Sequence, residues 1–247
     1  MNGGAALFRS DAALARARLK PAHPSPGDTA VGVMWNRMGG LLAALARRAE
    51  IDAAAALAVW IVECGGLPFV RGKPVLRFEP HVFFARWGKD HEAAFDAHFQ
   101  FGNRKGIEGA RWQNHRFREK QDDDWQRFHG DQQAENLALN LAASLTDEET
   151  AALCASFGGP QIMGFNHAIV GYESAADMAR AFARSERWQV CAFFDFCAAK
   201  DILPALKAID WAAFAAVYNG PGNAPAYAAK IAAAHDAART LLNEDET

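Results

Sequence analysis

One run of ten apolar residues, at positions 53–62, constrains this sequence more than any other segment. Asp52 precedes the run and is a good helix N-cap residue, while Gly65 follows it, where glycine commonly ends a helix. The run is far shorter than the ~20 residues that a membrane-spanning helix needs. A helix that is apolar on every side is stable only when it is buried. Residues 53–62 therefore predict a central, buried helix.

Alanine supports a mainly helical fold. The chain has 53 alanines among its 247 residues, and alanine has the highest helix propensity. Apolar periodicity and capping residues predict further helices at about 132–144, 147–155, 175–184, 186–199, 211–218 and 224–242. A turn containing Gly72, between apolar residues 69–70 and 75–78, predicts a small β-hairpin. We expect short helices and loops at 86–130, so the predicted class is α+β, predominantly α.

The ends of the chain differ in composition from its centre. Residues 1–28 are predicted to be an N-terminal extension and linker, because Pro21, Pro24, Pro26 and Gly27 interrupt a short basic segment. Residues 29–242 are predicted to form one domain. Residues 243–247 are predicted to be an acidic tail.

Charge and cysteine usage exclude several functional classes. A net charge of −3 gives no general reason to expect nucleic acid as a partner. The first 20 residues lack the apolar stretch of a secretory signal peptide, so we expect synthesis in the cytoplasm and no membrane insertion. The four cysteines form no CxxC pair, and the eight histidines form no HExxH motif. We therefore expect buried, reduced thiols and neither a metal nor an organic cofactor.

Glu63 is the first candidate for chemistry. It directly follows the apolar run, at the C-terminal end of the predicted helix. Its negative charge would oppose the helix dipole there, and apolar surroundings disfavour the ionised carboxylate. Both effects raise the pKa of Glu63, as a general acid working near neutral pH requires. The alternative is an exposed glutamate in the last helical turn, without a chemical role.

Two other segments combine glycine with polar side chains. Residues 156–166 place Gln161 and Asn166 among glycines, which allow close approach to a ligand. Residues 218–223 place Tyr218 and Asn219 at a helix end, an arrangement suited to sugar binding by ring stacking and amide hydrogen bonds. An ordinary turn explains either segment equally well.

Taken together and in this order, these segments resemble the phage-endolysin-type N-acetylmuramidases of the lysozyme-like superfamily. The resemblance covers roughly residues 36–235. The matching segments are 59–66, 76–83, 159–166, 171–172 and 214–220. Cys64 departs from the family pattern, which commonly has serine after the catalytic glutamate. The resemblance implies a lysozyme-like fold, with Glu63 as the catalytic acid and peptidoglycan glycan strands as the substrate.

The implied reaction is hydrolysis of the β-1,4 bond between N-acetylmuramic acid and N-acetylglucosamine. Glu63 would protonate the glycosidic oxygen while an oxocarbenium-like transition state develops. Gln161, Tyr172, Tyr218 and Asn219 would position the glycan. The enzyme would be a monomer that reaches the cell wall after release or delivery by another system. A lytic transglycosylase with the same glutamate, or a glycan-binding protein without activity, stays an alternative.

Glu79 is the candidate for a second carboxylate. It follows the expected strand at 75–78, which as the second strand of the hairpin should return towards the end of the Glu63 helix. In inverting glycosidases the acid and the base lie ~6.5–9.5 Å apart, which leaves room for a water molecule. The alternative for Glu79 is a structural carboxylate paired with a nearby arginine or histidine.

Overall fold

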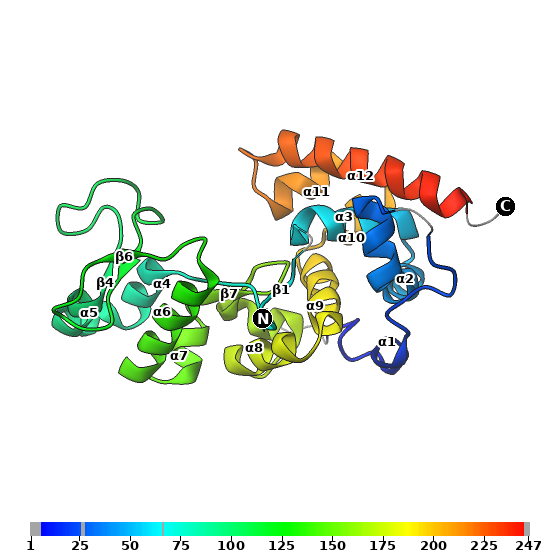
Figure 1. The fold of residues 1–247 in the computed structure, drawn as a ribbon. Coiled ribbons are helices and arrows are strands. Elements are labelled where there is room, and N and C mark those ends of the chain that lie inside the picture. Colours follow the sequence, from blue (N-terminus) through cyan, green and yellow to red (C-terminus); the bar gives the residue numbers. More distant parts are fainter. Residues whose placement is uncertain (1–5, 26–27, 66, 245–247) are drawn as a thin grey trace. The chain divides into compact units, whose positions relative to one another are not determined.

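The computed structural model describes residues 6–25, 28–65 and 67–244, which form mainly helices with small antiparallel sheets (Figure 1). This is the predicted α+β, predominantly α class. The chain folds into two compact units. The first contains the residues up to 68, residues 169–171 and the residues from 184 onward; the second contains 69–168 and 172–183. The beginning of the predicted extension and most of the predicted acidic tail lie outside the described residues.

Helix α3 (Ala53–Cys64) is the centre of the first unit, as the apolar run predicts. Every residue from position 54 to 60 is buried, and α3 packs against α2 (Ala30–Ala49) and α12 (Ala224–Glu244). The Asp52 side chain caps its start by accepting a hydrogen bond from the Ala54 N–H at 2.9 Å. Gly65 ends the helix in the left-handed region with φ 56°, a conformation that glycine adopts without strain. These caps place Glu63 in the last turn of a buried helix.

The other helices of the first unit are α1 (Ala12–Arg16), α9 (Glu186–Ala199), α10 (Leu203–Lys207) and α11 (Trp211–Tyr218). Residues of the predicted extension join their core, because Phe8 and Leu14 are buried in it. The buried carboxylate of Asp195 in α9 accepts hydrogen bonds from the Phe8 and Arg9 N–H groups, both at 2.9 Å. The described part of residues 6–25 is thus tied to the core, while the domain limits at 28 and 242 stay predictions.

Two sequence-based expectations concern thiols and membranes. All four cysteines are free and buried, which confirms the prediction of reduced core thiols. Burial raises the pKa of Cys154 and of Cys191 to about 12. In the described part of the chain, no helix is both long enough and apolar enough to span a membrane.

The second unit begins with a β-hairpin, but its second strand differs from the prediction. Strand β1 (Phe69–Val70) pairs with β2 (Lys73–Pro74) around Arg71 and Gly72, whose φ angles are 50° and 78°. A two-residue turn with positive φ at both positions places Lys73 directly opposite Val70. The hairpin is therefore complete before residue 75, and the prediction that residues 75–78 form its second strand is wrong.

Those residues belong to another sheet. Strand β3 (Leu76–Phe78) pairs with β7 (Ala155–Phe157), which pairs with β8 (Ile162–Met163), all antiparallel. Helix α6 (Gln132–Leu145) packs against β3 and against α7 (Glu148–Ala152). The side chain of Gln132 binds the backbone of Leu76 twice, accepting from its N–H at 2.9 Å and donating to its C=O at 3.0 Å. These contacts fix the strand that leads into Glu79.

The predicted irregular segment at 86–130 contains short elements and a small aromatic core. Its elements are η1 (Gly88–Asp90), α5 (Glu92–His98), β4 (Phe99–Gln100), β5 (Arg116–Phe117) and β6 (Gln126–Arg127), next to α4 (Pro80–Arg86). The core consists of fully buried phenylalanines: Phe83, Phe95, Phe99, Phe117 and Phe128. The 3-10 segment η2 (Gly164–Val170) and helix α8 (Ala175–Arg184) follow strand β8 in the sequence. The two-residue strands β4, β5 and β6 are too short to show an alternating sequence pattern.

Candidate active site

The first unit brings Glu63 and Asn219 into direct contact. Glu63 lies in the last turn of α3, and Asn219 is the C-cap residue of α11. The Asn219 Nδ2 atom donates a hydrogen bond to Glu63 Oε2 at 2.9 Å. The other carboxyl oxygen, Oε1, is buried and makes no hydrogen bond within the described residues. Glu63 and Asn219 were candidates from two separate segments of the sequence. In the structure they form one hydrogen-bonded pair that is surrounded by apolar side chains.

Burial determines the protonation of this carboxyl group. It raises the pKa of Glu63 to about 7, while the hydrogen bond from Asn219 favours the ionised form and limits the rise. At neutral pH a large fraction of the molecules therefore carries a proton on Glu63. Because Oε2 accepts from Asn219, Oε1 is the oxygen that holds this proton. This is the protonation state of a general acid.

Tyr218 lies beside this carboxyl group, within an aromatic cluster. Its ring stacks on Phe214, with centroids 5.6 Å apart and an interplanar angle of 9°, and its edges meet Phe193 and Phe196. Burial, together with the charge of Glu63, raises the pKa of the Tyr218 phenol far above its ordinary value. One face of the ring is thus covered by Phe214, and sugar stacking by Tyr218 stays a prediction.

Gln161 and Tyr172 belong to the second unit and have local partners there. Gln161 Oε1 accepts a hydrogen bond from Ser156 Oγ at 2.9 Å, and its Nε2 donates to the Gly158 C=O at 2.8 Å. Gln161 has a φ of 50°, so these bonds hold the turn between β7 and β8. The Tyr172 ring is buried edge-to-face against Phe182, with centroids 6.1 Å apart. Their roles as glycan contacts stay predictions.

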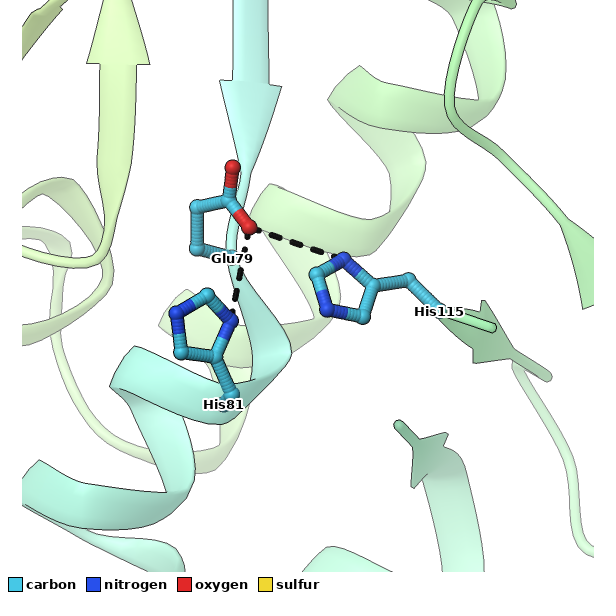
Figure 2. Close-up of side chains that lie close together, drawn as sticks. All are labelled: Glu79, His81 and His115. Atoms are coloured by element: carbon cyan, nitrogen blue, oxygen red, sulfur yellow. Dashed lines mark ion pairs between the residues drawn. The ribbon is translucent and has the colours of Figure 1, made fainter. Parts of the chain in front are cut away.

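Glu79 occupies the N-cap position of α4 in the second unit. Arg77 Nε donates to its Oε1 at 2.8 Å, and Oε2 faces His81 Nδ1 at 3.4 Å and His115 Nδ1 at 3.5 Å (Figure 2). Burial raises the pKa of Glu79, while the positive charge of Arg77 opposes the rise. Glu79 thus has both an arginine and histidines beside it, as expected if it is a structural carboxylate. Residues 75–78 are not the second strand of the hairpin, so the role of Glu79 as a base stays a prediction.

His115 links Glu79 to a second carboxylate. Its Nε2 contacts the Arg111 C=O at 3.0 Å, and its Nδ1 contacts His129 Nε2. His129 Nδ1 in turn lies 2.8 Å from Oε1 of the buried Glu135. Burial lowers the pKa of His115 to about 3, so its imidazole is neutral at neutral pH. This cluster cannot be recognised in the sequence, because its members come from separate segments that show no ligand-spacing motif.

A cavity in the second unit was also missed. Its volume is about 670 Å³, and it lies between the β1–β2 hairpin and α6. Arg71 and Lys73 line it from the hairpin, and the amides of Gln133, Asn136 and Asn140 line it from the helix. The signal was present in the sequence, because side chains three and four positions apart share one face of a helix.

Comparison with known proteins finds one matching family and a similar solved structure. The family model described as Muramidase, N-acetylmuramidase, matches residues 52–239, a range that contains every candidate residue discussed above. Among solved structures, the crystal structure of the Burkholderia AP3 phage endolysin is similar, with a TM-score of 0.64 and 27% sequence identity. That match covers 83% of this chain and 71% of the endolysin chain. A search of curated proteins finds no match.

The raised pKa of Glu63 predicts a stability difference that depends on pH. Between the ordinary pKa near 4.5 and the folded-state pKa of about 7, the folded protein binds the proton more tightly than the unfolded chain, so wild-type stability falls as the pH rises. A glutamine side chain at this position would stay neutral throughout. Glu63→Gln should therefore leave the free energy of unfolding nearly unchanged at pH 4 and raise it by about 3 kcal/mol at pH 8.

Urea denaturation at the two pH values measures this difference. The exposed Glu50 provides the matched control, and Glu50→Gln should show no such gain at pH 8. An equal effect of Glu63→Gln at pH 4 and pH 8 would contradict a raised pKa at Glu63.

Proposed function

The chain belongs to the N-acetylmuramidase family, and from this premise we propose that Glu63 is the general acid with which it hydrolyses the β-1,4 bond between N-acetylmuramic acid and N-acetylglucosamine. Family membership makes the protein a glycoside hydrolase that acts on peptidoglycan. The predicted resemblance to phage-endolysin-type muramidases and the predicted lysozyme-like fold are both confirmed.

The observation that carries the proposal is the state of the Glu63 carboxyl group. With a pKa of about 7, a large fraction of the molecules keeps this proton at neutral pH, and Oε1 has no hydrogen-bond partner of its own among the described residues. Oε1 would donate this proton to the glycosidic oxygen as the bond breaks and positive charge develops on the sugar ring. Glu63 becomes a carboxylate in this step, and the Asn219 N–H group already in place stabilises the new charge.

The remaining candidates are proposed as glycan-positioning residues. Tyr218 and Asn219 share the surroundings of Glu63 in the first unit, while Gln161 and Tyr172 would act from the second. Glu79 stays the sequence-based candidate for a second carboxylate. We also propose that the enzyme works as a monomer and reaches the cell wall after release or delivery by another system.

The cavity between the hairpin and α6 supports a substrate-binding role. Amides such as Asn136 and Asn140 can both donate to and accept from sugar hydroxyl and N-acetyl groups. Arg71 and Lys73 add positive charge that suits the carboxylates of peptidoglycan stem peptides. We propose that a section of the peptidoglycan strand binds in this cavity.

Replacement of Glu63 tests the acid directly. Glu63→Gln should lower the rate of peptidoglycan solubilisation by about 10²–10⁴-fold, since this is what general acid catalysis typically contributes. Glu50→Gln should keep the wild-type rate. Less than a tenfold loss in a folded Glu63→Gln protein would rule out Glu63 as the acid.

Mass spectrometry of the wild-type digest tests the bond and the reaction. The proposal requires fragments with N-acetylmuramic acid at the reducing end. Predominantly 1,6-anhydro ends would instead identify a lytic transglycosylase, and N-acetylglucosamine at the reducing end would identify a glucosaminidase.

The hydrogen bond from Asn219 predicts a shift of the pH–rate profile. The rate constant kcat/KM should fall as the pH rises through about 7, because Glu63 then loses its proton. Asn219→Ala removes a group that favours the ionised form, so the fall should move to higher pH. Asn243→Ala, at an exposed position of α12, is the control. An unmoved profile would show that Asn219 does not control the proton on Glu63.

Neutralising the cavity tests the substrate-binding proposal. Arg71→Ala combined with Lys73→Ala should weaken binding to purified peptidoglycan by roughly 30-fold, because each charge–carboxylate hydrogen bond contributes about 1 kcal/mol and the two together about 2 kcal/mol. A pull-down assay with insoluble peptidoglycan measures the binding. Lys89→Ala removes an exposed charge elsewhere in the second unit and should have no effect. Unchanged binding of the double variant would place the substrate outside this cavity.

A further inference from the structure

We propose that Glu79, His81 and His115 form a binding site for a divalent transition-metal ion, for which zinc is the best fit. The site lies within the second unit, and the proposal does not depend on the proposed role of Glu63. Each residue offers one ligand atom, and these three atoms lie within 4.8 Å of one another. Two imidazoles and one carboxylate are a common protein ligand set of zinc.

The two separations from Glu79 Oε2 to the imidazole nitrogens match those around a tetrahedral ion. Zinc binds imidazole nitrogen and carboxylate oxygen at ~2.0–2.2 Å, which places neighbouring ligand atoms of a tetrahedron ~3.3–3.5 Å apart. Glu79 Oε2 lies 3.4 Å from His81 Nδ1 and 3.5 Å from His115 Nδ1. Hydrogen bonds of this kind are usually ~2.7–3.2 Å long. Within the described residues, the buried Glu79 Oε2 and His81 Nδ1 atoms make no hydrogen bond.

The hydrogen bonds around these residues orient the ligand atoms. The Arg111 C=O can only accept, so His115 Nε2 carries the proton and donates it at 3.0 Å. In the neutral imidazole this leaves an unprotonated Nδ1 facing the carboxylate oxygen of Glu79 (Figure 2). The lone pairs of this nitrogen and of the carboxylate oxygen repel each other, and either a cation between them or a proton shared with His129 Nε2 offsets that repulsion. Metal-bound histidines commonly donate their other N–H to a backbone carbonyl in this way.

Glu79 is held in a similar manner. Arg77 Nε donates to its Oε1 at 2.8 Å, which fixes the carboxylate and leaves Oε2 directed at the two imidazoles. His81 lies in the first turn of α4, two positions after Glu79, so both come from one short stretch of backbone. A bound ion would therefore tie the start of α4 to the segment that precedes β5.

A proton shared between His115 and His129 accounts for only part of this cluster. It satisfies His115 Nδ1, and His129 is itself bound to Glu135. It leaves Glu79 Oε2 and His81 Nδ1 facing each other at 3.4 Å without a hydrogen bond. A metal ion accounts for all three atoms, and water would complete its coordination.

The test uses the full-length protein without a histidine tag, after treatment with EDTA and dialysis. Titration with Zn²⁺ against a chromophoric chelator should show one equivalent bound, and the thermal unfolding temperature should rise with Zn²⁺ but not with Mg²⁺. Replacement by Co²⁺ should give the intense visible absorption of tetrahedral cobalt. Absence of stoichiometric Zn²⁺ binding, or a weak octahedral Co²⁺ spectrum, would overturn the proposal without the use of any variant.

Variants locate the ion. His81→Gln and His115→Gln should each weaken Zn²⁺ binding at least ~10-fold, because losing even a hydrogen-bond partner of a metal ligand typically costs ~10–100-fold. The control variant is His98→Gln. In the wild-type protein the Nδ1 atom of His98 contacts the Arg118 C=O, outside the cluster. His115 is fully buried, so the partly exposed His81 provides the variant that is expected to fold, as checked by circular dichroism. Wild-type affinity in a folded His81→Gln protein would refute the site.

Discussion

Burial of α3 on every side is the constraint on which the first unit depends. A helix without a polar face must be surrounded, and α2 and α12 enclose it. The last turn is partly buried as well, and this burial keeps the Glu63 carboxyl group largely away from water. The chemistry of the carboxyl group is thus a consequence of the packing, because the raised pKa follows from burial rather than from a neighbouring charge.

The free energy gained by burying apolar side chains of α3 is large enough for the fold to tolerate the ionised form of Glu63. Burying side chains such as Leu57 and Val59 stabilises the folded state by roughly 1.5–3 kcal/mol each. Holding the ionised form of Glu63 above neutral pH costs about 3 kcal/mol. Two apolar residues of the same helix therefore offset that cost. The penalty also vanishes when the proton is bound, which is the form that the proposed reaction requires.

The sequence predicted those features that depend on neighbouring residues. A few adjacent residues are enough to predict the Asp52 cap, the end of α3 at Gly65 and the raised pKa of Glu63. The partner of residues 76–78 could not be found this way. Pairing of β3 with β7 depends on contacts between segments far apart in the chain, and a strand of three residues carries too little pattern to identify its partner.

Contacts between residues far apart in the sequence also explain why the cluster of Glu79, His81 and His115 in the second unit was not predicted. His81 and His115 have no informative spacing, and only the packing of α4 beside the segment before β5 brings their Nδ1 atoms to one carboxylate oxygen. Asn219 is an intermediate case. Its position at a helix end was visible in the sequence, but its hydrogen bond to Glu63 required the contact between α11 and α3.

Glu63 and Glu79 show two ways in which a protein can keep a carboxyl group away from water. Burial raises the pKa of both. Glu63 has a neutral amide as its partner, so a proton is the natural counter-charge, and it is a proton that can be transferred to a leaving oxygen. Glu79 is held by the Arg77 guanidinium on one oxygen and faces imidazole nitrogens with the other, which favours an ionised carboxylate and a bound cation. A metal ion on Oε2 would lower the basicity of the Glu79 carboxylate, which a base that activates water needs. In a metal-loaded protein Glu79 would link the start of α4 to the segment before β5, and it would be a weaker base than in the metal-free protein.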